Sequence, residues 1–214
     1  MIVYLFRHGR SQANEAALVT GTPADELSAE GIAQAHRTAE WLAQAGIAAD
    51  RYYVSQWGRA RQTAAILYPD AHWQEDTRLG ETHAGEVADW TQARFAAAYP
   101  TFHADPSQHY PGGESHLELN ARALDWLHGQ LSQPCDAVAV AAHSGPISCI
   151  LQDVMGIGMA RFPAFLPGHA SLTVIEMRKP SGGGEWSGRL LGFSMGPVTN
   201  LAAAMLGPQR PRAS

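Results

Sequence analysis

Two arginines and two histidines stand at or soon after the ends of short apolar runs, and side chains of these types could bind a phosphoryl group. Arg7 and His8 directly follow the apolar run 2–6. Arg59 and His143 come soon after the ends of two later runs. Arginine offers a planar fork of N–H donors that fits phosphate oxygens, and neutral imidazole is a nucleophile at physiological pH. Gathered in one place, these residues would form a receptor for phosphoryl transfer.

The segments that must position these residues alternate between strand-like and helix-like patterns. Apolar runs rich in β-formers predict strands at 2–6, 51–55, 136–142, 171–177 and 189–194. Helix-like patterns predict helices at 29–45 (with Ser28 as N-cap and Gly46 at its end), 58–67, 86–99, 114–131 and after His143 as far as Met155. This alternation predicts an α/β fold, a three-layer αβα sandwich with a mostly parallel central sheet. Ligand sites in such sheets lie beyond the carboxyl ends of the strands, where the four residues would converge.

The length and charge of the chain indicate one acidic domain. A chain of 214 residues can build one sizeable core, so we expect a single catalytic domain at 1–206 and a flexible tail at 207–214. A flexible glycine-rich turn is expected at 181–184. The net charge of −5 argues against a general binder of nucleic acid or of anionic membranes. The run 171–177 is expected to be an apolar edge strand, which could pair with a second copy in a homodimer or be covered.

Cysteine and histidine spacing shows neither a disulfide framework nor a metal site. Cys135 and Cys149 have no CxxC spacing, so a reduced, cytoplasmic setting is expected. No apolar run approaches the roughly 20 residues that span a bilayer. The histidines lack the HExxH pattern and the paired Cys/His spacing of zinc sites, so neither a metal nor a cofactor is expected. No catalytic role is assigned to His72, His103, His109, His116, His128 and His169.

Six blocks of the sequence resemble the signature of the histidine phosphatase superfamily, which includes the cofactor-dependent phosphoglycerate mutases. The blocks are Arg7-His8-Gly9 with Asn14, Leu27-Ser28-Ala29-Glu30-Gly31 with Gln34-Ala35, Ser55 with Arg59-Ala60 and Gln62-Thr63, Leu79-Gly80-Glu81, Pro111-Gly112-Gly113-Glu114-Ser115, and Ala142-His143-Ser144-Gly145. One Arg-His-Gly tripeptide is a weak signal, but six blocks in the family's order are a strong one. The resemblance implies a phosphoglycerate mutase-like fold.

The resemblance also implies roles at the phosphate end of the site. His8 would be the nucleophile that becomes phosphorylated. Arg7, Arg59 and His143 would hold the phosphoryl oxygens, and Asn14 would be a secondary contact to the phosphate. The implied chemistry needs no metal, because the arginines neutralise the charge that Mg²⁺ neutralises in other phosphotransferases.

Glu81 would then be the general acid for the leaving oxygen, and afterwards the base for the water that attacks phosphohistidine. Two other carboxylates compete for this assignment. Glu86 is a loop acid, whereas Glu114 is better suited to support a helix N-terminus through the helix dipole. Ser144, in the second histidine motif, is assigned to substrate binding.

Three further residues are assigned to substrate binding, each with a structural alternative. Arg10 stands where the family usually has glutamate, and its charge would favour a substrate with a second anionic group unless it is paired. His83, two residues after Glu81, could face the mouth of the pocket. Trp57, beside Arg59, would be either a lid over the substrate or part of the packing.

The acid loop favours hydrolysis over isomerisation. Mutases of the family typically read Glu-Arg-His-Tyr-Gly here, whereas this chain reads Glu81-Thr82-His83-Ala84-Gly85. The arginine and tyrosine that would grip a substrate carboxylate are absent. We therefore expect a metal-independent phosphomonoesterase that acts on a small phosphorylated metabolite. A phosphoglycerate mutase-type phosphotransferase is the alternative, and a non-catalytic phosphate-binding module is less favoured.

Overall fold

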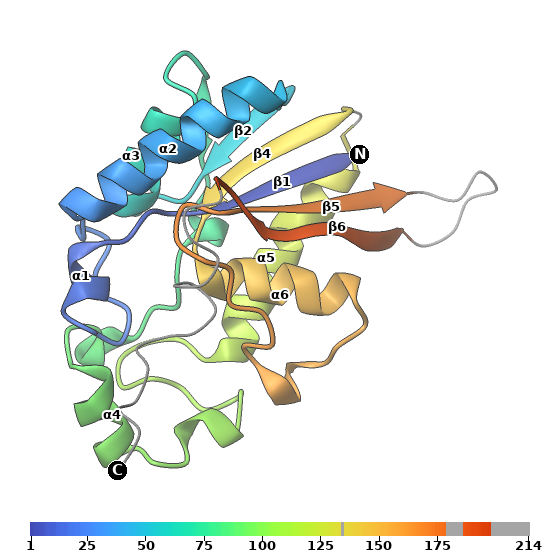
Figure 1. Cartoon of the computed structure of the whole chain (residues 1–214). Helices are drawn as coiled ribbons and strands as arrows, with labels where there is room; N and C mark the ends of the chain where they lie inside the picture. Colours follow the sequence, from blue (N-terminus) through green and yellow to red (C-terminus); the bar gives the residue numbers. More distant parts are fainter. Residues whose placement is uncertain (134, 179–185, 198–214) are drawn as a thin grey trace, which may run out of the picture.

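A central sheet runs through the structure, and helices cover both of its faces (Figure 1). The computed structural model describes residues 1–133, 135–178 and 186–197, so the turn expected at 181–184 and the tail expected at 207–214 lie outside the described residues. Within them, the sheet has six strands in the order β3-β2-β4-β1-β5-β6. The strands are β1 (Ile2–Arg7), β2 (Arg51–Val54), β3 (Trp73–Glu75), β4 (Ala137–Ala142), β5 (Leu172–Arg178) and β6 (Ser187–Met195).

The strands that precede the predicted site residues are parallel neighbours, as expected. β1 pairs with β4 so that Arg7 lies opposite Ala142, and β2 pairs with β4 in the same direction. The carboxyl ends of these three strands therefore meet at one edge of the sheet. β5 runs antiparallel to β1, with its first residue Leu172 opposite Phe6. The chain just before β5 therefore arrives at the same edge.

Four helices form the two outer layers. α2 and α3 cover one face of the sheet, and α5 and α6 cover the other (Figure 1). The expected ends of α2 are confirmed, because the Ser28 side chain accepts a hydrogen bond from the Gly31 amide and Gly46 adopts the left-handed conformation. In the described part of the chain, no helix is both long enough and apolar enough to cross a membrane. The bounds are α2 (Ala29–Ala45), α3 (Gly58–Leu67), α5 (His116–Leu131) and α6 (Ser144–Val154).

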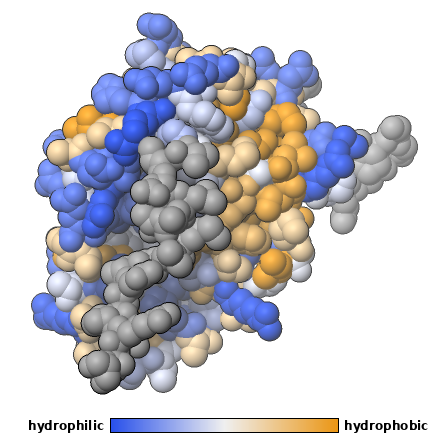
Figure 2. Space-filling model, in the orientation of Figure 1, coloured by the Kyte–Doolittle hydropathy of each residue, from blue (hydrophilic) through white to orange (hydrophobic). Residues whose placement is uncertain are grey.

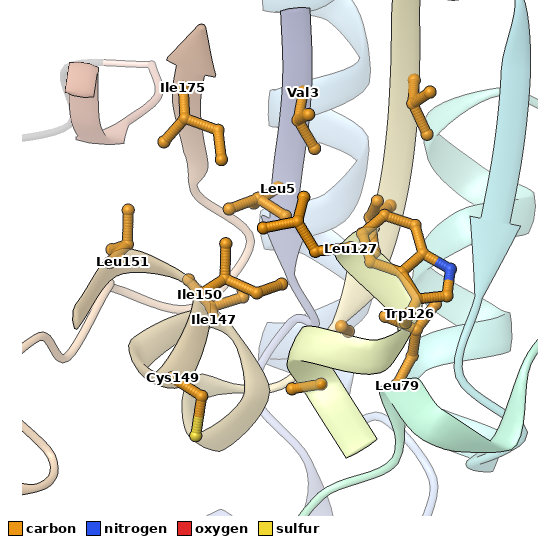
Figure 3. Packing of buried hydrophobic residues seen from close by; sticks show 14 of the residues in the cluster. Val3, Leu5, Leu79, Trp126, Leu127, Ile147, Cys149, Ile150, Leu151 and Ile175 are labelled. Carbon is orange, nitrogen blue, oxygen red and sulfur yellow. The ribbon is translucent and has the colours of Figure 1, made fainter. Parts of the chain in front are cut away.

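The main hydrophobic core lies between the sheet and the layer of α5 and α6. Val3 and Leu5 of β1 belong to this core together with Trp126 of α5, and Figure 3 shows their side chains on the same side of the strand. Phe6 packs instead with Leu42 of α2 in the core of the opposite face. Because both faces are covered, the strand reads as a continuous apolar run in the sequence.

The expected helix at 86–99 is wrong. This segment contains a 3₁₀ helix, Gly85–Val87, and the short helix α4, Gln92–Ala98. Thr91 separates the two, because its side chain caps the start of α4. The helix α1 (Gln12–Glu15) and the strand β3 are both too short to give a periodic pattern, and the sequence therefore does not predict them.

The expected edge strand is also wrong. The run 171–177 falls almost entirely in β5, which lies between β1 and β6, so the described sheet ends at β3 and β6. Leu191 and Phe193 on β6 are 51% and 39% exposed, and Figure 2 shows hydrophobic surface on this side of the molecule. A homodimer formed through a sheet edge stays a prediction.

Candidate active site

A cavity of about 240 Å³ lies beside the carboxyl ends of β1 and β4. Residues from segments far apart in the sequence line it, and several of them are predicted from the sequence. The predicted residues in its lining are Arg7, His8, Asn14, Arg59, Glu81 and Ser144. The fold therefore brings most of the predicted site residues to one place.

His8 is a buried histidine with a defined tautomer. Its Nδ1 lies 2.6 Å from the carbonyl oxygen of Gly9, so Nδ1 carries a proton and donates it to that oxygen. The other ring nitrogen, Nε2, then keeps its lone pair. Burial, together with the positive charges of Arg59 and Arg7, holds the pKa of His8 well below its usual range. His8 is thus a neutral imidazole in the cavity wall with Nε2 able to act as a nucleophile.

His143 lies behind His8 and is completely buried, with the two ring centres 5.0 Å apart. Arg59 donates through Nε to His143 Nδ1 at 3.3 Å, and His143 Nε2 lies 2.8 Å from the Ser55 hydroxyl oxygen. Burial and then the charge of Arg59 lower the pKa of His143 well below its usual range. Both ring nitrogens are therefore engaged by the protein, and His143 does not line the cavity. In this arrangement it supports Arg59 and His8 from behind.

Arg59, in the first turn of α3, is held by a buried ion pair. Its side chain is 2% exposed, and its Nη1 donates to Asp25 Oδ2 and to the Thr20 carbonyl oxygen, each at 2.8 Å. The guanidinium also lies over the ring of Trp57, 4.6 Å from the ring centre. These contacts fix the guanidinium in one orientation at the cavity wall.

Arg7 is held by the chain segment that leads into β5. Its Nη1 donates to the Pro167 carbonyl oxygen at 2.6 Å, and its Nη2 lies 3.0 Å from His169 Nε2. Burial and the neighbouring arginines lower the pKa of His169 to about 3, so its Nε2 accepts the hydrogen bond. The buried Nε of Arg7 has no hydrogen-bond partner among the described residues, which leaves a donor for an anion in the cavity.

His169 is a site residue that the sequence analysis missed. Its ring centre lies 5.8 Å from that of His8, and its hydrogen bond orients Arg7. The direction of the strands gives the signal from which this residue could have been predicted. His169 precedes β5 closely, and an antiparallel strand begins at the edge where its parallel neighbours end.

Glu81 is the carboxylate of the cavity. Its Oε1 accepts a hydrogen bond from the Thr82 amide at 2.9 Å, and its Oε2 accepts from the Ser144 hydroxyl at 3.3 Å and the Gly145 amide at 3.4 Å. The carboxylate therefore sits at the N-terminus of α6, where the helix dipole favours a negative charge.

The two rival carboxylates lie elsewhere. Glu114 accepts hydrogen bonds from the His83 amide at 2.8 Å and from Arg122 Nη2 at 2.6 Å, so it joins the acid loop to α5. Glu86 is exposed and does not line this cavity. Glu81 is thus the best placed of the three to exchange a proton with a bound ligand.

The lack of a side chain at Gly145 leaves room for the Glu81 carboxylate. A Cβ atom at this position would collide with Glu81 Oε1 and would lie 3.1 Å from Leu119 Cδ2. We expect Gly145→Ala to lower kcat by about 10²-fold, the scale of a misplaced general acid, because the carboxylate must move. Steady-state kinetics measures this effect, and denaturant unfolding measures any change in stability separately.

Gly129→Ala is the matched control. Gly129 also lies in a helix, and a Cβ there would meet nothing closer than Arg78 Nη1 at 3.8 Å. An unchanged kcat in Gly145→Ala would show that the position of the Glu81 carboxylate does not matter for turnover.

Of the remaining predicted residues, one lines the cavity and the others lie around it. Asn14 lines the cavity while its side chain accepts a hydrogen bond from the Ser11 amide in the cap of α1. Trp57 is 3% exposed and packs edge-on against the His143 ring, which supports its packing alternative rather than a lid. Arg10 and His83 are exposed, and neither lines this cavity.

The far side of the cavity is uncharged and was not predicted. Apolar and aromatic residues from three stretches of the chain form most of it. They are Leu18, Val19, His103, Tyr110, His116, Phe162, Pro163 and Leu166. Among the described residues, no group of three His, Cys, Asp or Glu side chains is arranged to hold a metal ion.

Comparisons with known proteins give relatives of the chain in both sequence and structure. A family model described as the histidine phosphatase superfamily (branch 1) matches residues 3–186. A Proteus mirabilis protein named "Probable phosphoglycerate mutase GpmB" is 31% identical over 163 residues, 72% of this chain and 75% of that protein. A glucosyl-3-phosphoglycerate phosphatase from Mycolicibacterium vanbaalenii is 29% identical over 174 residues, 74% of this chain and 76% of that protein. The structure of a mycobacterial glucosyl-3-phosphoglycerate phosphatase with VO3 matches at 26% identity and TM-score 0.79, over 90% of this chain and 98% of the other.

Proposed function

The chain belongs to the histidine phosphatase superfamily, and on that premise we propose that it hydrolyses a small phosphomonoester through a phosphohistidine intermediate on His8. The observation that carries the proposal is the state of His8. It is a neutral imidazole with its Nε2 lone pair uncommitted, in the wall of a cavity that Arg7 and Arg59 also line. A mycobacterial glucosyl-3-phosphoglycerate phosphatase has been solved with VO3, whose three oxygens on one central atom correspond to those of a phosphoryl group in transfer.

In the first step, His8 Nε2 attacks phosphorus and the bond from phosphorus to the ester oxygen breaks. Glu81 gives its proton to the leaving oxygen, so an alcohol departs. Arg7 and Arg59 balance the charge that spreads over the phosphoryl oxygens. The proton on His8 Nδ1 stays in its hydrogen bond to Gly9, which stabilises the ring while Nε2 carries the phosphoryl group.

In the second step, water attacks the phosphohistidine. The Glu81 carboxylate takes a proton from the water, the bond between phosphorus and Nε2 breaks, and the electron pair returns to the ring. Inorganic phosphate leaves, and both His8 and Glu81 are restored to their starting protonation states. His143 acts in this scheme by holding Arg59 and by packing behind His8.

Mutase activity is the second candidate, because a relative of this chain carries a phosphoglycerate mutase name. A mutase must hold a substrate carboxylate while it moves the phosphoryl group. Thr82 lines the cavity and Ala84 is buried, and neither can neutralise a carboxylate. This absence of a cation in the acid loop favours hydrolysis.

The two activities separate in one assay. The protein is incubated in EDTA with 4-nitrophenyl phosphate and, separately, with 3-phosphoglycerate. We expect inorganic phosphate from the aryl phosphate and little or no 2-phosphoglycerate from 3-phosphoglycerate. Rapid isomerisation without phosphate release would establish the mutase instead, and the absence of both reactions would leave the phosphate-binding module.

A further inference from the structure

We propose that the far side of the cavity is a subsite for an uncharged, ring-shaped leaving group, which packs against the rings of His103 and His116 and hydrogen-bonds with Tyr110. The proposal names the substrate class of the site described above, and so it rests on the proposed hydrolysis. The first support is a wall of packed rings. The second is the distribution of charge around the cavity.

The wall is built from rings that support one another. His103 and His116 stack with their centres 5.8 Å apart and an angle of 9° between their planes. The Tyr110 hydroxyl lies 3.4 Å from His116 Nε2, and the Phe162 ring packs against that of His116 with the ring centres 4.7 Å apart. Phe102, which is fully buried, backs Tyr110 at 4.3 Å. Such a wall is held in place before any ligand arrives, and flat faces of this kind favour ring-shaped ligands.

The rings of this wall carry no charge at neutral pH. Burial, followed by the neighbouring His103, lowers the pKa of His116 to about 4. Partial burial also lowers the pKa of His103, and burial followed by the charge of Glu81 raises the pKa of Tyr110. The wall therefore offers faces and hydrogen-bonding atoms but no cation to a leaving group.

The cations of the cavity lie at its other end. Among the described residues of the lining, these are Arg7 and Arg59, whose charges act on His8, whereas Glu81 is near enough to Tyr110 to raise its pKa. Arg94 lies on α4, but its guanidinium is held over Trp90 at 3.5 Å and it does not line the cavity. A second anionic group on the substrate would thus face uncharged rings and Glu81 rather than Arg7 or Arg59. A carboxylate or a second phosphate there would lose its hydration without gaining a partner.

The test uses two matched pairs of substrates and the full chain. One pair, 4-carbamoylphenyl phosphate and 4-carboxyphenyl phosphate, has the same shape and differs in charge. The other, benzyl phosphate and butyl phosphate, differs in the presence of a ring but not in the type of leaving alcohol. We expect kcat/KM to be about tenfold higher or more for the uncharged member of the first pair, and about tenfold higher for the ring-bearing member of the second.

Substitution of His103 separates binding from the intrinsic reactivity of each substrate. His103 is exposed, so His103→Arg places a cation on the wall without removing a buried side chain. We expect the carbamoyl-to-carboxyl ratio to fall by about tenfold in His103→Arg, and the benzyl-to-butyl ratio to narrow in His103→Ala. His109→Arg is the control, because His109 is an exposed histidine of the same loop that does not line the cavity. Its ratios are expected to match those of the unsubstituted chain.

The outcomes test the subsite and the proposed hydrolysis separately. Phosphate release from all four substrates, with ratios that His103→Arg and His103→Ala do not change, would overturn the subsite and leave the hydrolysis standing. A preference for the carboxylate in the unsubstituted chain would also overturn it. Hydrolysis of none of the four would overturn the proposed function, and the subsite with it.

Discussion

His8→Ala is expected to lower the hydrolysis of 4-nitrophenyl phosphate by on the order of 10⁴-fold or more, the scale seen when an enzyme loses its covalent nucleophile. Alanine has no lone pair to attack phosphorus, and no neighbouring group replaces it. His143 is 5.0 Å away from ring centre to ring centre, and both its nitrogens are engaged. Phosphate release in steady state measures the loss, and denaturant unfolding checks that the variant folds.

A second readout separates loss of the nucleophile from loss of binding. The unsubstituted chain, quenched during turnover of ³²P-labelled substrate, is expected to carry acid-labile label, and His8→Ala none. His36→Ala is the control, because His36 is an exposed histidine on α2, away from the cavity. Retained turnover in His8→Ala would contradict the mechanism, whatever the state of the fold.

Arg59→Ala is expected to damage both activity and stability. Loss of one preorganised donor to the phosphoryl oxygens lowers kcat/KM by about 10²–10³-fold. The same change leaves Asp25 as a buried carboxylate without its partner, which costs about 3–5 kcal/mol of the free energy of unfolding. Kinetics at a temperature well below the unfolding transition, and urea unfolding of the same sample, measure the two effects.

Arg61→Ala is the matched control on the same helix. Arg61 pairs with Glu75 at 3.3 Å, but both side chains are 51% exposed, and exposed pairs contribute only about 0–1 kcal/mol. The double variant Arg59→Ala with Asp25→Ala should recover part of the stability and none of the activity. If the double variant regains activity as well, Arg59 acts only through the fold.

The sequence predicts well which residues gather around His8, for a physical reason. β1 and β4 are covered on both faces, so they appear as uninterrupted apolar runs whose ends are easy to locate. Parallel pairing then places Arg7 and His8 beside the residues that follow β4. The lengths of the apolar runs and the parallel direction of the strands are therefore enough to predict roughly where these residues lie.

The remainder of the site depends on contacts between segments without any periodic pattern. His103 lies in the short 3₁₀ helix Phe102–Ala104 and His116 at the start of α5, and only the folded chain stacks one on the other. His169 is 161 positions from His8 in the chain, and no local signal links the two residues. The engagement of both nitrogens of His143 likewise depends on Ser55 and Arg59, whose side-chain directions the sequence does not specify.

The cavity has two sides with different origins in the chain. The reactive side is attached to the ends of buried strands, whereas the aromatic wall comes from the segments 102–116 and 162–166, which contribute no strand to the sheet. Mutations in His103, Tyr110 or Phe162 can therefore accumulate without displacing His8. During evolution, such a chain can exchange one metabolite for another by small steps while it keeps an unchanged reaction. Loop transplants between relatives should accordingly transfer substrate preference while the turnover chemistry stays intact.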